Sequence, residues 1–230
     1  MSHLEATNDN QDGRFAITIY SDVICPWCYV GKRRFEVAAG SPGMPERIEI
    51  SWRPFELNPD MPVEGMDRAA YRLRKFGADK AREIDERMAE VGREIGISFA
   101  FDKMKRTPNT RLAHRLIWQA EREGSAAQNG LVDLLFRSYF EEGRDIGSKS
   151  ELLALAGEAG LDVDGARRAL EDDAILDAVL DLEDQAIRMG VQGVPFFLVV
   201  NKYAISGAQP PELWRDALPQ IAAELQGATG

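Results

Sequence analysis

The sequence is poor in residues that cross-link a chain or hold a metal ion. Among its 230 residues are two cysteines and two histidines. A framework of several disulfides is therefore excluded. A structural zinc ion requires four ligands, and besides the cysteines only His3 and His114 remain as usual partners. His3 lies in a polar N-terminal stretch and His114 stands alone in a predicted helix, so we expect no metal site.

Long apolar runs and excess positive charge are missing as well. No run is long enough to span a bilayer, and residues 1–13 lack the apolar core of a secretory signal. The chain carries 28 Lys and Arg against 38 Asp and Glu, a formal net charge of −10. This balance disfavours nucleic acids and anionic membranes as partners. We expect a cytoplasmic protein with a disordered tail over residues 1–14.

What the chain does contain is a cysteine pair, with two residues between the cysteines, at a predicted strand–helix junction. Residues 15–20 alternate and predict a strand. Pro26 suits the first position of a helix, so Cys25 would lie at a helix N-terminus, with Cys28 one turn further in. Unpaired N–H groups and the helix dipole favour a thiolate there. We expect Cys25 to be exposed and Cys28 to be more buried.

A redox centre is the favoured interpretation of this pair, because a structural disulfide across so short a loop would stabilise little. In such a centre the Cys25 thiolate attacks a substrate disulfide and Cys28 resolves the mixed disulfide.

Pro26 and Trp27 separate the two sulfurs, and Trp27 either tunes the reduction potential of the cysteine pair or forms an apolar wall beside it. Asp22 either exchanges a proton during resolution or, as we favour, caps the first turn of the helix.

The strand pattern predicts a single mixed sheet. Two alternating segments flank the first predicted helix, which makes a βαβ unit with parallel strands. Two further strands follow near the C-terminus. The four predicted strands are residues 15–20, 48–52, 196–200 and 203–206.

The segment between the two strand pairs is helical almost throughout. A helix start is predicted at Thr107-Pro108 and a capping box at residues 148–151. The expected fold class is therefore α/β, a four-stranded mixed sheet of βαβ-αββα order with a large all-helical insertion. We expect a sheet domain from residues 15–60 and 183–226 and an inserted domain from residues 61–182.

Several of these motifs together resemble a known family. Cys25-Pro26-Trp27-Cys28, the helical insertion and the Gly-Val-Pro-Phe-Phe stretch at residues 193–197 are similar to the DsbA-like branch of the thioredoxin superfamily. Within it the chain resembles FrnE-type proteins, relatives of 2-hydroxychromene-2-carboxylate isomerases and kappa-class glutathione transferases. That likeness rests on residues 20–28, 52–59, 109–110 and 113–116, and covers roughly residues 15–225.

The resemblance implies a thioredoxin fold and a thiol–disulfide oxidoreductase acting on protein or small-molecule disulfides. Cys25 would be the nucleophile and Cys28 the resolving thiol. Pro195 would be a cis-proline facing the disulfide, which would leave the Val194 backbone free to pair with an extended substrate segment. No resident cofactor is implied, although glutathione is a candidate substrate or recycling reductant.

Two departures from the relatives bear on the chemistry. Some FrnE-type proteins carry a second cysteine pair, which this chain lacks, so no internal disulfide relay is expected. The isomerase and transferase relatives typically have serine at the Cys25 position, so cysteine there favours redox chemistry.

Two alternatives remain open. One is a glutathione-dependent isomerase or transferase, in which Cys25 activates a glutathione sulfur under a closed apolar cavity. The other is a non-catalytic protein with vestigial cysteines. Asn58 and His114 either line a substrate groove between the subdomains or are satisfied polar groups. The sequence leaves open a monomer or homodimer and the direction of redox traffic.

Overall fold

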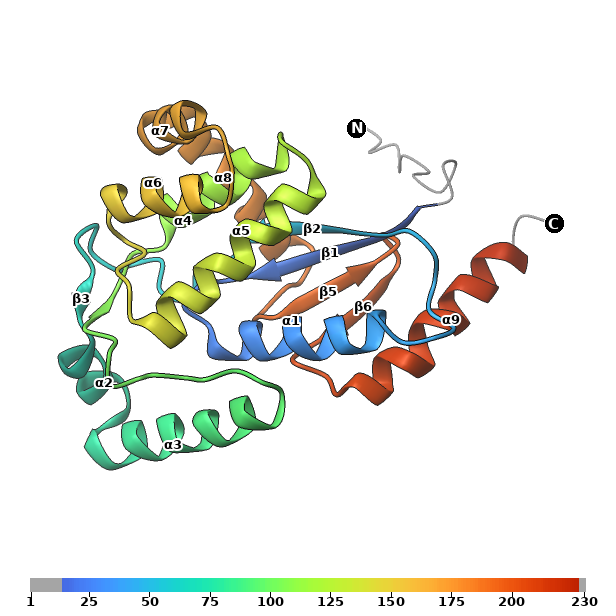
Figure 1. Ribbon diagram of the computed structural model, residues 1–230, viewed down its shortest axis with the longest axis horizontal. Helices are drawn as coiled ribbons and strands as arrows, with labels where there is room; N and C mark the ends of the chain where they lie inside the picture. The colour runs from blue at the N-terminus through green and yellow to red at the C-terminus, as the bar shows by residue number, and fades with distance from the viewer. Residues whose placement is uncertain (1–13, 228–230) are drawn as a thin grey trace.

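The computed structural model describes residues 14–227 and contains the expected four-stranded mixed sheet (Figure 1). The strand order is β2-β1-β5-β6. Strand β1 pairs in parallel with β2 and antiparallel with β5, which pairs antiparallel with β6. The predicted α/β class is confirmed, whereas the tail predicted for residues 1–14 lies, apart from Arg14, outside the described residues. The strands are β1 (Phe15–Ser21), β2 (Ile48–Pro54), β5 (Phe196–Val199) and β6 (Tyr203–Ser206).

One face of the sheet is buried under helices α1 (Pro26–Ala39) and α9 (Pro211–Gly227). Three aromatic rings fill the space between them. Trp214 of α9 lies with its ring centroid 4.7 Å from that of Phe197 in β5 and 5.2 Å from that of Phe35 in α1. The sheet and the two helices thus share one apolar core.

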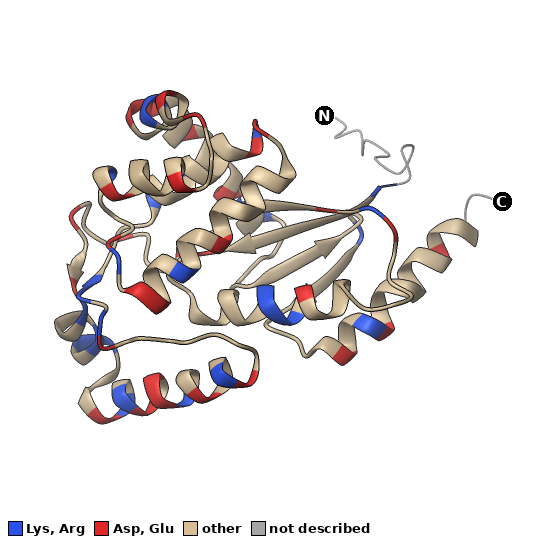
Figure 2. Cartoon of the chain, in the orientation of Figure 1, with Lys and Arg blue, Asp and Glu red and all other residues tan. Residues whose placement is uncertain are grey.

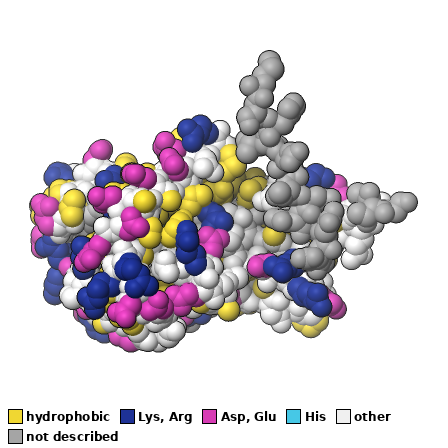
Figure 3. Space-filling model, turned by 90° about the horizontal axis from the view of Figure 1, so that it is seen from above, with side chains coloured by type: hydrophobic (Ala, Val, Ile, Leu, Met, Phe, Trp, Pro, Cys, Tyr) yellow, Lys and Arg dark blue, Asp and Glu magenta, His cyan; other side chains and the backbone are white. Residues whose placement is uncertain are grey.

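The chain between β2 and β5 forms the helical insertion. In Figure 1 the helices of residues 111–188 lie on the β2 side of the sheet. The two helices of residues 68–94 form a separate hairpin near the N-terminal end of α1. Seen from above, acidic and basic side chains are intermixed, with hydrophobic side chains exposed between them (Figure 3). The elements are β3 (Met66–Asp67), α2 (Arg68–Phe76), α3 (Ala78–Glu94), β4 (Arg106–Thr107), α4 (Arg111–Glu121), α5 (Ser125–Arg137), the π-helix η2 (Ser138–Glu142), α6 (Lys149–Glu158), α7 (Val163–Glu171) and α8 (Asp173–Arg188). No helix of the described residues is long and apolar enough to cross a membrane.

Of two helix starts predicted in the insertion, one is wrong and one is correct in position. The helix start at Thr107-Pro108 fails because Thr107 pairs with Met66 in the short β3–β4 ladder, and α4 begins only at Arg111. The helix start at the predicted capping box is confirmed, since Ser148 is the N-cap of α6, but the Ser148 hydroxyl contacts Ser150 instead of a helix N–H. The predicted domain boundary between residues 182 and 183 falls within the continuous helix α8.

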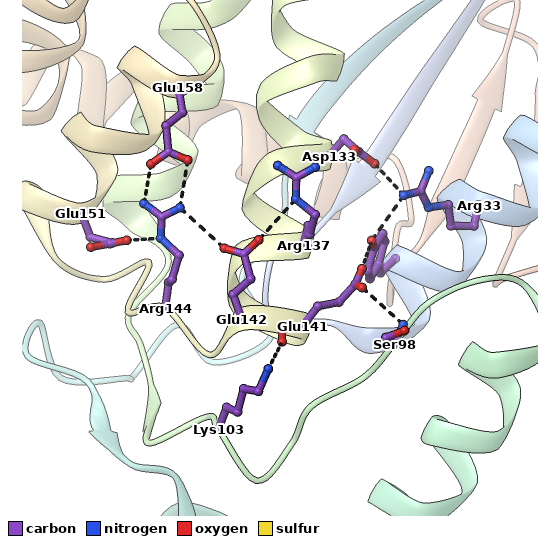
Figure 4. Close-up of polar contacts among 11 residues, drawn as sticks. Arg33, Ser98, Lys103, Asp133, Arg137, Glu141, Glu142, Arg144, Glu151 and Glu158 are labelled. Carbon is purple, nitrogen blue, oxygen red and sulfur yellow. Dashed lines mark hydrogen bonds and ion pairs between the residues drawn. The ribbon is translucent and has the colours of Figure 1, made fainter.

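Polar contacts tie α1 to the insertion (Figure 4). The buried Tyr29 hydroxyl donates to Glu141 of η2 at 2.6 Å, and the Tyr29 ring stacks on Phe136. Burial and the Glu141 contact raise the pKa of Tyr29. The ammonium group of Lys32, also buried, contacts Asp133 of α5 at 2.9 Å. Because Tyr29 directly follows Cys28, these contacts set the position of the cysteine-bearing turn relative to the insertion.

A core substitution on α1 tests the shared core. Phe35→Ala is expected to lower the free energy of unfolding by about 3–5 kcal/mol, because the ring is buried and its removal leaves a cavity. Val37→Ala on the same helix is the control and should change it by only about 0.5 kcal/mol, since Val37 is 54% exposed. Denaturant unfolding measures both, and equal effects would contradict this packing.

Candidate active site

The two cysteines occupy the first turn of α1. Cys25 is the N-cap in an extended conformation, Pro26 is the first helical residue, and the Cys28 N–H donates to the Cys25 carbonyl at 3.0 Å. Both thiols are free and buried, with exposed fractions of 4% and 1%. The expectation that Cys25 is exposed is wrong, because its sulfur faces a cavity walled by the insertion and by Val194.

The loop before β5 lies directly against this turn. The Val194-Pro195 peptide bond is cis, and the Cys25 thiol contacts the Val194 carbonyl oxygen at 3.7 Å. The approach depends on Gly31, which lies in the middle of α1. A Cβ atom there would lie 2.9 Å from the Pro195 ring, too close without a shift. The sequence interpretation missed Gly31, although a glycine inside a predicted helix often has a packing reason.

Cys28 is the more deeply placed thiol. Burial, followed by the hydrogen bond and charge of Cys25, raises the pKa of Cys28 well above its ordinary value. The Ser21 hydroxyl and the Asp22 backbone act in the opposite direction. Burial therefore favours the neutral thiol of Cys28.

Asp22 does not cap α1, which corrects the preferred interpretation of that residue. Its side chain is fully buried and accepts hydrogen bonds from the backbone N–H groups of Leu57 at 2.8 Å and Ile24 at 3.4 Å. The buried ring of His114 places Nε2 3.7 Å from Asp22 Oδ1. His114 therefore stands behind the cysteine turn, and neither it nor Asp22 is among the residues that line the cavity.

A second buried carboxylate holds the segment that follows β2. Glu183 of α8 accepts the backbone N–H of Glu56 at 2.5 Å, and the Glu56 side chain binds Arg111 at 3.0 Å. Burial raises the pKa of Glu56, with Arg111 opposing and Glu183 adding to the shift. These contacts, together with Asp22, position Leu57 and Asn58 in the wall of the cavity that Cys25 also lines.

The cavity next to Cys25 has a volume of about 360 Å³. Of the residues predicted to contact substrate, Pro26, Trp27, Asn58 and Val194 line it. The sequence interpretation expected a groove against the insertion but missed the residues that form it, most of all the cationic side chains of α2. The signal was present, since α2 carries four basic residues and no acidic one. The other lining residues are Ile24, Leu57, Arg68, Tyr71, Arg72, Lys75, Phe76, Ile84, Asp85, Met88, Phe101, Met104, Thr107, Tyr139 and Phe140.

Three hollows of larger volume, about 500, 610 and 630 Å³, lie elsewhere on the described residues. One is next to the end of α9, one lies on the sheet face opposite α1, and the smallest is lined by β2 and the start of α5. None of the three is lined by a cysteine. The cavity at Cys25 is therefore the one in which a bound molecule would meet a nucleophile.

Comparison with known proteins agrees with this geometry. Residues 16–219 match the model of the DsbA-like thioredoxin domain. The chain belongs to this family. The resemblance to the DsbA-like branch is thereby confirmed, and with it the thioredoxin fold and membership in a family of thiol–disulfide oxidoreductases.

Three relatives illustrate the range of the family. The crystal structure of a probable DsbA oxidoreductase from Streptomyces coelicolor is 32% identical with a TM-score of 0.82, over 92% of this chain and 91% of that one. The Bacillus subtilis (strain 168) protein YwbO is 28% identical over 88% of this chain and 94% of its own. The cytosolic disulfide reductase DsbM from Pseudomonas aeruginosa, solved with GSH, shares the fold at 18% identity and a TM-score of 0.62, over 92% and 99%.

The raised pKa of Cys28 predicts its alkylation behaviour. In a Cys25→Ser variant, the rate of reaction of Cys28 with iodoacetamide should rise with pH to a midpoint above that of an ordinary thiol, because burial disfavours the thiolate. The same variant unfolded in urea is the control, with a midpoint near the ordinary value of about 8.5. Equal midpoints in the folded and unfolded protein would contradict the burial argument.

Proposed function

We propose that this protein is a thiol–disulfide oxidoreductase whose redox centre is the pair Cys25 and Cys28. The observation that carries the proposal is the position of Cys25. Its sulfur borders a cavity, faces the Val194 carbonyl, and has the Cys28 thiol one helical turn away. Cysteine at both positions supplies a nucleophile and a resolving group within a single rigid turn.

The exchange proceeds in two displacements. The Cys25 thiolate attacks one sulfur of the substrate disulfide, whose S–S bond breaks and releases a thiolate. Cys28 then loses its proton and attacks Cys25, which forms the internal disulfide and releases the second thiolate. Two electrons and two protons pass from the protein dithiol to the substrate. The Ser21 hydroxyl and the Asp22 backbone favour the Cys28 thiolate in the second step.

Val194 and the wall at residues 57–58 orient the substrate. The Val194 carbonyl lies opposite Cys25, so a substrate segment that pairs with this backbone would bring its disulfide to the sulfur. Trp27, which is 38% exposed, forms an apolar wall at the same opening.

In a reducing cytoplasm, the compartment expected from the sequence, Cys25 and Cys28 would be kept as a dithiol and would reduce substrates. Glutathione is the proposed recycling thiol.

A second candidate is a glutathione-dependent isomerase or transferase of the 2-hydroxychromene-2-carboxylate isomerase type. The observation in its favour is that Cys25 borders a partly enclosed cavity and not an open groove. Its relative DsbM was solved with GSH. Isothermal titration of the reduced protein with glutathione tests this candidate, and an absence of binding would exclude it.

Serine substitutions separate the roles of the two cysteines. Cys25→Ser should abolish single-turnover reduction of insulin or of a small aromatic disulfide by the pre-reduced protein, because the attacking sulfur is gone. Cys28→Ser is the matched variant and should still attack, but should stop at a mixed disulfide that mass spectrometry detects. Turnover that survives Cys25→Ser would overturn the proposal.

A further inference from the structure

The cavity at Cys25 contains more positive than negative charge. Arg68 and Arg72 of α2 both donate to Asp85 of α3, at 2.8 Å and 2.7 Å. Among residues 14–227, Asp85 is the one carboxylate that lines this cavity. One carboxylate thus faces two guanidinium groups. Figure 2 shows the basic residues gathered at α2.

A third cation in the cavity has only neutral partners within the described part of the chain. The Lys75 ammonium group donates to the Tyr71 hydroxyl at 2.7 Å and to Asn58 Oδ1 at 3.0 Å. Since Asn58 and Lys75 both line the cavity that Cys25 borders, this charge belongs to the same cavity as the sulfur. With Arg68, Arg72 and Lys75 against Asp85, the lining carries two uncompensated positive charges, which attract an anion in a partly enclosed cleft.

The rest of the lining is largely apolar. Aliphatic and aromatic side chains cover the walls between α2 and the cysteine turn, and a polar amide buried against them would lose its hydrogen bonds to water. A volume of about 360 Å³ is at the small end of the range for ligand pockets and does not admit a folded polypeptide. These walls are Ile24, Leu57, Phe76, Ile84, Met88, Phe101, Met104 and Phe140.

On the basis of the function proposed above, we infer that the cavity selects small disulfides with an apolar body and an acidic group. The anion would lie against Arg72 and Lys75 while the disulfide meets Cys25. Cys25 attacks the nearer sulfur, the substrate S–S bond breaks, and Cys28 displaces the second thiolate as the internal disulfide forms. The pre-reduced protein itself supplies both electrons, so no further reductant enters the single turnover.

Three disulfides test this selectivity in single-turnover reactions with the pre-reduced protein. Dithiobis(nitrobenzoate) is aromatic and anionic, dithiodipyridine is aromatic and neutral, and glutathione disulfide is anionic with a peptide body. Each rate constant is divided by the rate constant of the same disulfide with free dithiothreitol. This ratio corrects for the intrinsic reactivity of each disulfide toward a thiol. We expect the anionic aromatic disulfide to exceed the neutral one by roughly tenfold, and this preference to fall with added salt.

Charge variants of the insertion give effects of opposite sign. Lys75→Gln should lower the ratio of anionic to neutral rates by roughly threefold, since an exposed cation contributes modestly. Asp85→Asn should raise the ratio, because it frees both guanidinium groups. Arg74→Gln is the matched control, since Arg74 is exposed on the same helix but is not among the residues lining the cavity. It should leave the ratio unchanged.

The outcomes separate this inference from the proposed function. Normalised rates that are equal for the two aromatic disulfides, or highest for glutathione disulfide, would overturn the inference while leaving the oxidoreductase in place. Equal shifts in the ratio for Lys75→Gln and Arg74→Gln would overturn it as well. If the protein reacts with all three disulfides no faster than its Cys25→Ser variant, the proposed function itself fails.

Discussion

The buried carboxylate of Asp22 joins three parts of the molecule that are far apart in the sequence. Its backbone carbonyl accepts the N–H of Cys25, and its side chain accepts the N–H of Leu57 and lies beside His114. A buried charge is tolerated only when hydrogen-bonding partners replace water. Asp22 therefore joins the strand–helix turn to the segment at Leu57, which lines the cavity, and His114 of α4 packs against the same side chain.

The helical insertion acts as a wall of the site as well as a cover for the sheet. The hydrogen bond from Tyr29 to Glu141 and the stacking of Tyr29 on Phe136 couple the helix that bears the cysteines to α5 and η2. A π-helix such as η2 occurs often at functional sites, and here it supplies Tyr139 and Phe140 to the cavity. The hairpin of α2 and α3 forms another wall of the cavity and supplies the cationic side chains of Arg68, Arg72 and Lys75.

Two of the predictions that failed share one physical cause. Thr107 and Asp22 both have side chains suited to starting a helix, but Thr107 joins the β3–β4 ladder and the Asp22 carboxylate accepts the N–H of Leu57. Capping is worth only about 1 kcal/mol, so a tertiary partner readily replaces it. The burial of Cys25 could not be predicted either, because the walls that cover its sulfur come from α2, α3 and the loop at Val194.

The sequence alone determined the alternating strands, the helix that begins at Pro26, and the placement of Cys25 and Cys28 in one helical turn, because each depends on neighbours within a few residues. It also indicated the family, through motifs that are continuous in the chain. Only the tertiary structure decided that Gly31 admits the Pro195 ring, that Asp22 holds Leu57, and that Arg72 and Lys75 share a cavity with Cys25. These are contacts between distant segments, and their geometry is set by how the insertion packs on the sheet.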